Sequence, residues 1–491
     1  MTNPLDILND DIIMNSYNVI KNSGIQFGTS GARGLVTQFT HEACSAFTHA
    51  FLSSIKSKFN FCQVAIAIDN RPSSEFIATV CIDAIKKQGF EPLYYGVIPT
   101  PALANTAMQS NIPCIMVTGS HIPFDRNGLK FYRPDGEITK TDELEILNSN
   151  VEFELSPTLA PLLPVNPLAT EQYIQRYRSI FDEKLLEGKR IGIYEHSSAG
   201  RDIYPVLFKQ LGAEVISLKR SDVFVPIDTE AVSEEDKIRA QNWSKLYGFD
   251  ALFSTDGDGD RPLVADENGV WLRGDILGLL CSLEMGIEAL AIPVSCNTII
   301  SKTEQFKCVK QTKIGSPYVI EELTNLAQTY SKIAGFEANG GFLLGSDILI
   351  NNKPLTALPT RDAVLPFLML LSAAKKMSIS SLVNTLPQRI TFSDRIQNFA
   401  TEKSKSIIEK AASNPDKLLS DLGFSDARIL EINTIDGLRM TLSNSNIIHL
   451  RPSGNAPELR CYAEANSAEI AQSIVTQTLT RLQHFSSKAF N

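Results

Sequence analysis

Short apolar runs alternate with longer helical patterns through most of this 491-residue chain. The apolar run Val64–Ile68 is followed by a helical pattern over Ser74–Gly89, and a further apolar run follows at Cys114–Thr118. Strands separated by helices tend to pair in parallel, with the helices covering the sheet. The same alternation restarts at Arg190–Tyr194 and at Leu290–Val294. The chain is therefore predicted to contain three similar α/β domains with mixed, mostly parallel sheets.

The pattern changes beyond about residue 388. Helical patterns over Thr401–Ala412 and Ala468–Phe485 enclose several short apolar strands, which predicts a separate C-terminal α+β domain. A proline-rich stretch at 155–167 predicts a connector between the first two domains. The predicted domains are 1–165, 166–273, 274–387 and 388–491.

Composition excludes several classes of protein. A net charge of −9 argues against a protein that binds a nucleic acid through a broad basic face. Eight scattered cysteines without a C-x-x-C pair predict reduced thiols, and no signal peptide is visible, so we expect a cytoplasmic protein. The longest apolar stretch, Ala363–Ala374, is shorter than the roughly 20 residues of a membrane span and predicts a buried helix. We expect no membrane partner, and the sequence gives no indication of the oligomeric state.

The segment Thr118-Gly-Ser120-His121-Ile-Pro123 directly follows an apolar predicted strand. A serine at a strand end, in a tight turn, is well placed to act as an exposed nucleophile. His121 could orient this turn, and Lys130, a few residues later, could stabilise charge or move a proton. An ordinary polar turn with a surface lysine is the alternative interpretation.

Asp256, Asp258 and Asp260 alternate with glycines between two apolar runs. Such carboxylates can converge on one hard cation, and their mutual repulsion disfavours a cluster without one. Magnesium is the predicted ligand. The alternatives are a solvated acidic turn and a calcium loop, but an EF-hand needs glycine where Arg261 stands, and helices as flanks.

Three further segments combine glycines with polar or cationic side chains. The segment from Arg451 to Arg460 offers guanidinium groups, a hydroxyl, an amide and exposed backbone, which suit a phosphate dianion. The segment Gly335–Gly341 carries a carboxylate and an amide that can grip vicinal hydroxyls, and Gly28–Gly34 carries one cation. Each of these three could by itself be a structural or surface turn.

Together the five segments predict a serine nucleophile, a divalent cation, a hydroxyl-binding loop and a phosphate clamp. Phosphoryl transfer on a phosphosugar needs this set, because its catalysis consists mainly of positioning and charge neutralisation.

In the content and order of these segments, the chain resembles the α-D-phosphohexomutases, the phosphomannomutase/phosphoglucomutase family. The resemblance implies four domains around a central cleft. It places the phosphoserine loop in 1–165, the metal loop in 166–273, the sugar loop in 274–387 and the phosphate loop in 388–491.

The resemblance also implies the chemistry. Ser120 would carry a phosphoryl group and exchange it with a mannose phosphate through a hexose 1,6-bisphosphate, reversibly linking the C6 and C1 phosphates. One Mg²⁺ would be held by Ser120, Asp256, Asp258 and Asp260. The implied catalytic residues are Ser120, His121, Lys130 and Arg33. The implied substrate-binding residues are Thr29, Ser30, Arg261, Gly315, Glu337, Asn339, Arg451, Ser453, Gly454, Asn455 and Arg460.

The chain departs from the family's usual loops at several positions. The usual serine loop is Thr-Ala-Ser-His-Asn-Pro, and here Gly119 and Ile122 replace its Ala and Asn. The usual sugar loop is Gly-Glu-x-Ser-Gly-His, and here Phe336 is inserted while Asn339 and Gly341 replace its Ser and His. In the phosphate loop Asn455 replaces the common Thr. These changes affect the sugar contacts and not the nucleophile or the metal ligands.

Three alternatives to a mannose phosphate mutase remain. The first is a mutase of glucose or glucosamine phosphate, and the second is a magnesium-dependent phosphatase that releases inorganic phosphate. The third is a sugar-phosphate-binding protein without catalysis, which would need neither Ser120 nor the three aspartates.

Overall fold

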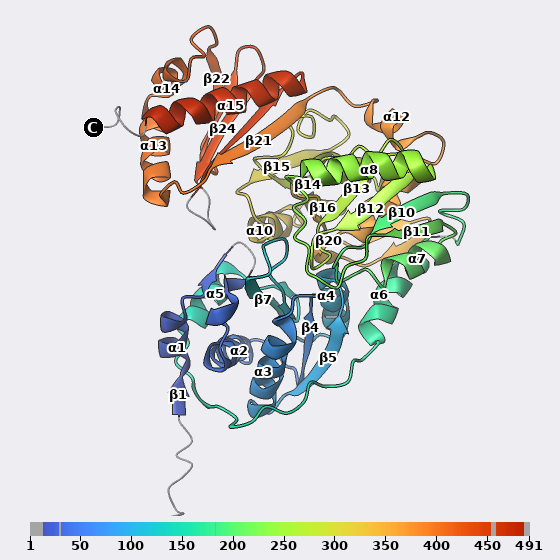
Figure 1. Ribbon diagram of the computed structural model, residues 1–491, viewed down its shortest axis with the longest axis vertical. Helices are drawn as coiled ribbons and strands as arrows, with labels where there is room; N and C mark the ends of the chain where they lie inside the picture. Colours follow the sequence, from blue (N-terminus) through green and yellow to red (C-terminus); the bar gives the residue numbers. More distant parts are fainter. Residues whose placement is uncertain (1–12, 29–30, 182, 453–457, 486–491) are drawn as a thin grey trace, which may run out of the picture. The chain divides into compact units, whose positions relative to one another are not determined.

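The computed structural model describes residues 13–28, 31–181, 183–452 and 458–485 (Figure 1). Backbone contacts divide the chain into two compact units. The first unit comprises Met1–Asp228 and Ser254–Asp260, and the second comprises Thr229–Phe253 and Arg261–Asn491. The division into four domains is finer than this one and stays a prediction.

A mixed sheet forms the core of the first unit, in the order β2-β3-β7-β6-β4-β5, with β8 beside β7. β4 pairs in parallel with β5 and β6, whereas β7 runs antiparallel to β6 and β3. The strands are β2 (Gln26–Phe27), β3 (Ala32–Leu35), β4 (Gln63–Ile68), β5 (Glu91–Val97), β6 (Cys114–Val117), β7 (Arg126–Arg133) and β8 (Gly136–Glu137). The antiparallel strand β7 follows the serine turn directly, so the serine and Lys130 belong to one hairpin of the sheet.

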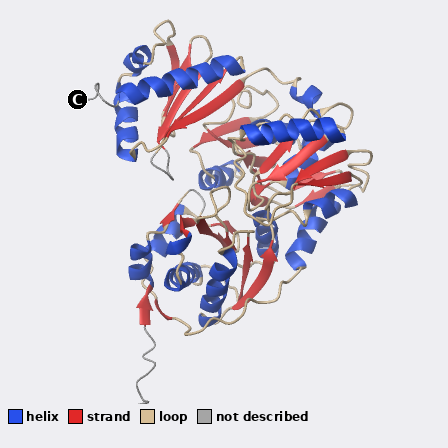
Figure 2. Ribbon diagram, viewed as in Figure 1, coloured by secondary structure: helices blue, strands red, loops and turns tan. Residues whose placement is uncertain are grey.

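The helices of this region are among those drawn in blue in Figure 2. They are α1 (Ser16–Ser23), α2 (His41–Ile55), α3 (Ser74–Lys87), α4 (Thr100–Gln109) and α5 (Lys140–Leu147). α3 packs on β4 and β5, and α4 packs on β4 and β6. A short pair, β1 (Ile13–Asn15) with β9 (Glu152–Glu154), joins the two ends of this region.

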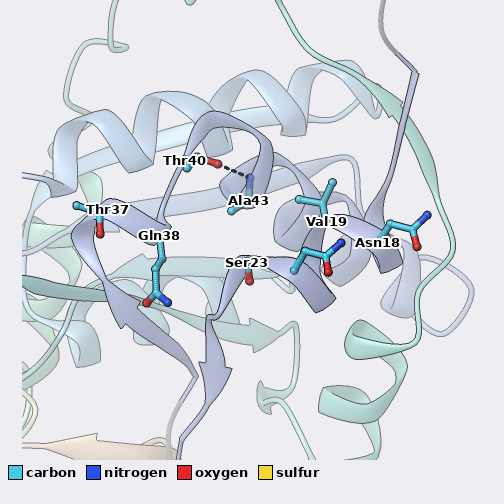
Figure 3. Close-up of a pocket in the computed structure, with 8 residues that line it drawn as sticks. Asn18, Val19, Ser23, Thr37, Gln38, Thr40 and Ala43 are labelled. Carbon is cyan, nitrogen blue, oxygen red and sulfur yellow. Dashed lines mark hydrogen bonds between the residues drawn. The ribbon is translucent and has the colours of Figure 1, made fainter.

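Thr40 caps the N-terminus of α2: its hydroxyl accepts a hydrogen bond from Ala43 N at 3.2 Å and so satisfies one free amide of the first turn. Beside this cap lies a pocket of about 420 Å³, lined by α1, by η1 (Val36–Gln38) and by the start of α2 (Figure 3). None of the predicted site residues that the structure describes lines this pocket.

The first unit continues, after the coil at 155–167, into α6 (Leu168–Arg178), β10 (Arg190–Tyr194), α7 (Tyr204–Gln210) and β11 (Glu214–Leu218). β10 and β11 pair in parallel, as the sequence predicted. The aspartate loop then lies between two strands, β12 (Ala251–Thr255) and β13 (Pro262–Ala265).

The second unit contains a mixed sheet in the order β15-β14-β16-β17-β20. Its strands are β14 (Ala289–Pro293), β15 (Cys308–Thr312), β16 (Ile333–Phe336), β17 (Phe342–Leu344) and β20 (Leu358–Asp362), and a separate hairpin consists of β18 (Ile348–Ile350) and β19 (Lys353–Leu355). The helices are α8 (Glu234–Tyr247), α9 (Gly274–Glu284), α10 (Ser316–Leu326), α11 (Val364–Ala373) and α12 (Ile379–Val383). α11 is the predicted buried helix, and it packs against α9.

The C-terminal part of the second unit is a five-stranded antiparallel sheet in the order β21-β25-β24-β23-β22. The strands are β21 (Ile390–Ile396), β22 (Ile429–Asn433), β23 (Leu438–Leu442), β24 (Ile447–Pro452) and β25 (Leu459–Ala465). Its helices are α13 (Thr401–Ser413), α14 (Pro415–Asp421) and α15 (Ala468–Phe485). The expected α+β character is confirmed, although the sequence analysis did not identify β21 or α14.

Within the described residues, no helix is both long enough and apolar enough to cross a lipid bilayer.

His49 is a buried titratable group in the first core. Its ring stacks on Phe153 with the ring centres 4.9 Å apart, and burial lowers its pKa to about 4. Its ordinary pKa is about 6.5, so between those two values the unfolded chain binds a proton that the folded chain does not. Stability is therefore lost as the pH falls through this window, by about 3 kcal/mol from this group.

We expect His49→Phe to reduce this acid sensitivity, because phenylalanine keeps the stacking and has no proton to bind. The measurement is the free energy of unfolding in urea at pH 7 and at pH 4, for the variant and the wild type. The free energy of unfolding should fall less between pH 7 and pH 4 in the variant than in the wild type. An equal decrease in both proteins would show that His49 is not the source of the acid sensitivity.

Candidate active site

Ser120 lies in the turn that follows β6, and it is buried. Its φ of 57° is in the left-handed region, which is uncommon for residues other than glycine and recurs at functional sites. The Ser120 hydroxyl donates a hydrogen bond to Asp256 Oδ2 at 2.6 Å, and His121 Nδ1 lies 3.4 Å from the same hydroxyl oxygen. The residue predicted as nucleophile thus contacts the loop predicted to bind metal.

The three aspartates of that loop form a tight, buried cluster. Their potential ligand oxygens all lie within 4.8 Å of one another. The two glycines between the aspartates allow the loop to take this compact form. A Cβ on Gly257 would lie 2.7 Å from the Ser120 carbonyl oxygen, and Gly259 has a φ of 69°, in the left-handed region. The cluster consists of Asp256, Asp258 and Asp260. Oxygen donors of this kind suit hard cations such as Mg²⁺ and Ca²⁺.

Lys130, on β7, supplies positive charge to the cluster. Its Nζ donates to Asp258 Oδ2 at 2.5 Å and to Asp260 Oδ2 at 2.7 Å. Thr100, at the start of α4, also donates to Asp258 Oδ2. Among the described residues, no hydrogen-bond partner faces the other oxygen of Asp258, Oδ1. Asp258 Oδ1 is therefore an oxygen that a divalent cation could use.

Arg33 lies on β3, in register with Gly128 of β7. The sheet therefore brings it to the strand that carries Lys130. Thr29 and Ser30, which were predicted to bind substrate, lie outside the described residues. Arg261 directly follows the aspartate loop, is the first residue of the longer segment of the second unit, and is buried.

Glu337 and Asn339 lie in the turn between β16 and β17 of the second unit, and both are buried. A buried arginine on β20, Arg361, donates to Glu337 Oε2 at 3.2 Å. Asn339 Oδ1 accepts a hydrogen bond from Gly341 N at 3.0 Å. A Cβ on Gly341 would lie 2.5 Å from Arg361 Cδ. Arg361 thus fills the space that a side chain at position 341 would need.

The two arginines predicted to hold a phosphate are cross-strand neighbours. Arg451 on β24 is directly opposite Arg460 on β25, so their side chains lie on one face of the sheet. Arg451 Nε donates to Asp436 Oδ2 at 2.9 Å, and the same oxygen accepts a hydrogen bond from Ile314 N at 2.9 Å. Asp436 therefore joins Arg451 to the loop of Gly315. Ser453, Gly454 and Asn455 lie outside the described residues.

Sequence reasoning missed four polar residues that support the predicted site residues. They are Arg71, Thr100, Arg361 and Asp436. Arg71 was visible only as part of a turn after a strand, and the other three carry no local signal, because their partners are distant in the sequence.

Three family models match the chain. They are phosphoglucomutase/phosphomannomutase alpha/beta/alpha domain I over residues 24–154, alpha/beta/alpha domain III over residues 274–390, and the C-terminal domain over residues 398–480. The chain belongs to the phosphoglucomutase/phosphomannomutase family. It is accordingly an enzyme, an isomerase of the phosphohexomutase class.

Among its relatives is the phosphomannomutase of Salmonella muenchen, 59% identical over 96% of this chain and 98% of that protein. The phosphomannomutase of Sinorhizobium fredii is 39% identical over 94% of this chain and 99% of that protein. The phosphoglucosamine mutase of Alkaliphilus oremlandii is 24% identical over 91% of this chain and 96% of that protein.

The fold is shared with a phosphoglucomutase/phosphomannomutase family protein from Burkholderia thailandensis. The TM-score is 0.72 at 20% identity, over 94% of this chain and 98% of that one. Parafusin, a phosphoglucomutase from Paramecium, gives a TM-score of 0.70 at 14% identity, over 94% and 95% of the two chains. At these identities the likeness concerns the fold.

We expect Lys130→Met to destabilise the protein by about 3–5 kcal/mol, because it leaves buried carboxylates without their cation. The measurement is urea unfolding in the presence of a chelator. Lys140→Met is the matched control: its ion pair with Glu143 is partly exposed, with 46% of the lysine side chain accessible, and its loss should cost at most about 1 kcal/mol. Equal effects of the two substitutions would contradict the role given to Lys130.

Proposed function

We propose that this enzyme is a phosphomannomutase, which interconverts mannose 6-phosphate and mannose 1-phosphate through a phosphoserine at Ser120 and a hexose 1,6-bisphosphate. The observation that carries the proposal is the contact of Ser120 Oγ with Asp256 Oδ2 at 2.6 Å, inside a buried acidic cluster. The 59% identical relative, a phosphomannomutase, supports the choice of sugar.

The cluster fits Mg²⁺, since it offers three buried carboxylates and an oxygen of Asp258 without a hydrogen-bond partner among the described residues. The ligands would be Asp256, Asp258, Asp260 and an oxygen of the phosphoserine at Ser120. When bound, Mg²⁺ supplies positive charge that stabilises the transferring phosphoryl group.

The residues of the chain itself position the reactants. The turn after β6 presents Ser120 in one orientation, and His121 steadies the hydroxyl end of its side chain. Lys130 and Arg33 would stabilise charge on the transferred phosphate and move a proton to or from the sugar hydroxyl. Each transfer breaks one P–O bond and forms another, so no further reactant is needed.

The remaining residues would hold the sugar while its two ends exchange roles. Arg451 and Arg460, opposite each other on β24 and β25, are suited to grip the phosphate that does not react. Glu337 and Asn339 would contact the sugar hydroxyls. Thr29, Ser30, Arg261, Gly315, Ser453, Gly454 and Asn455 complete the proposed substrate-binding set. The four-domain division, with one loop in each domain, is part of this proposal.

A cytoplasmic location is also part of the proposal. All eight cysteines are free thiols, and six of them are buried, which suits a reducing compartment. The proposed small-molecule partner is a hexose phosphate.

A panel of sugar phosphates tests the activity. We expect kcat/KM to be highest for mannose 1-phosphate, ahead of glucose 1-phosphate and glucosamine 1-phosphate, with a trace of hexose 1,6-bisphosphate as activator. Ser120→Ala should lower kcat on every sugar by about 10³-fold or more, because the covalent route is lost. A higher kcat/KM for another sugar, or release of inorganic phosphate faster than isomerisation, would overturn the assignment in favour of the corresponding alternative.

The metal site is tested separately with Mn²⁺, a paramagnetic substitute for Mg²⁺. We expect Asp258→Asn to weaken Mn²⁺ binding by about tenfold or more, since a charged ligand is lost. Free Mn²⁺ is measured by electron paramagnetic resonance during titration. Asp135→Asn, on an aspartate with 54% of its side chain exposed, is the control and should bind as the wild type does. Unchanged binding in Asp258→Asn would exclude this residue as a ligand.

A further inference from the structure

Arg71 lies beneath the serine turn, and its side chain is fully buried. Its Nε donates a hydrogen bond to Asp69 Oδ2 at 3.0 Å. Its two terminal nitrogens donate to four backbone carbonyl oxygens of the serine turn, at distances from 2.6 to 2.9 Å. The four carbonyls belong to Ser120, Ile122, Pro123 and Arg126. The five N–H donors of a guanidinium group are thus all used.

Asp69 extends this contact to the other side of the serine. Its Oδ2 accepts a hydrogen bond from Thr118 Oγ1 at 2.7 Å, and Thr118 Oγ1 in turn accepts one from Ser120 N at 2.8 Å. Ser120 O is held by Arg71. The Asp69–Arg71 pair therefore fixes both the N–H and the C=O of the residue whose side chain is proposed to react.

Two further residues, Phe224 and Gly119, lie close to the guanidinium group. The ring of Phe224 lies over Arg71 Cζ, with the ring centre 4.0 Å away. Gly119 is so close to the same carbon that a Cβ built on it would lie 2.6 Å from Arg71 Cζ. The missing methyl group leaves room for Arg71.

Two physical requirements explain why the turn needs such a support. A serine with a φ of 57° occupies a region that costs free energy for a residue with a Cβ. Buried carbonyl groups without hydrogen-bond partners also destabilise a loop. Arg71 meets the second requirement for four carbonyls at once, and in doing so it maintains the strained conformation of Ser120.

We propose that Arg71 is a positioning residue for phosphoryl transfer, and that Gly119 is the matching small residue that lets its guanidinium group reach the serine turn. This inference rests on the proposed function of Ser120. Arg71 acts on the reaction through the backbone of the turn, whose position sets the distance between Ser120 Oγ and Asp256.

The first test is Arg71→Ala in the mutase assay, with the full-length protein. We expect kcat to fall by about 10²-fold, because a displacement of about 1 Å at the reacting atom has an effect of this size, while KM changes less than threefold. Guanidinium chloride at millimolar concentration should raise the kcat of Arg71→Ala at least tenfold, and methylammonium chloride should not. Arg71→Lys should stay impaired, since an ammonium group lacks the planar fork of donors.

Gly119→Ala provides a second variant that keeps Arg71 and adds only a methyl group. It should lower kcat about tenfold with little change in KM. Arg190→Ala, on a partly exposed arginine that pairs with Glu214, is the control and should match the wild type. Wild-type kcat in both Arg71→Ala and Gly119→Ala, or restoration by methylammonium as well as by guanidinium, would overturn the proposal.

Hydrogen exchange separates this inference from the proposed function. Amides of 118–126 should exchange at least tenfold faster in Arg71→Ala than in the wild type, whereas amides of β4 should be unchanged. If the wild type isomerises none of the sugars, the proposed function fails, and the exchange measurement still tests the support of the turn. Unchanged exchange in 118–126 would overturn the role of Arg71 even in an active enzyme.

Discussion

The repulsion among three buried carboxylates is the constraint on which the architecture of the first unit depends. Asp256, Asp258 and Asp260 lie within 4.8 Å of one another and away from water, so their charge must be offset from nearby elements. Lys130 comes from β7, and Thr100 comes from the start of α4. The sheet order β3-β7-β6-β4 is what brings these donors, together with the serine turn, to one place.

The second unit shows the opposite arrangement, with cations gathered on one face of a sheet. Arg451 and Arg460 are direct neighbours across β24 and β25, which is unfavourable in itself. Asp436 offsets part of this repulsion through its contact with Arg451. The overall charge of −9 conceals this difference between an acidic cluster in the first unit and a pair of arginines in the second.

The sequence was sufficient for groups that are close together along the chain. The spacing of the three aspartates, and the position of Ser120 directly after a strand, are local patterns, and the structure brings these residues into contact. The supporting residues could not be predicted in this way: Arg71 reaches carbonyl groups about 50 positions later in the chain, and backbone acceptors leave no mark in an amino-acid sequence.

Two elements of the C-terminal domain were missed for a different reason. β21 is an edge strand with mixed polar and apolar residues, and only its register with β25 makes it a strand. α14 has seven residues, fewer than a hydrophobic period can reveal, although Asn414 caps it and Pro415 begins it.

The close approach of Gly341 to Arg361 limits which residues can occupy position 341. A histidine, the usual residue at this place in the family's sugar loop, would collide with the arginine that holds Glu337. A larger side chain at 341 could be accommodated only if Arg361 moved or were replaced by a smaller residue. The conformation of the turn between β16 and β17 thus depends on a residue of β20, about 20 positions later in the chain.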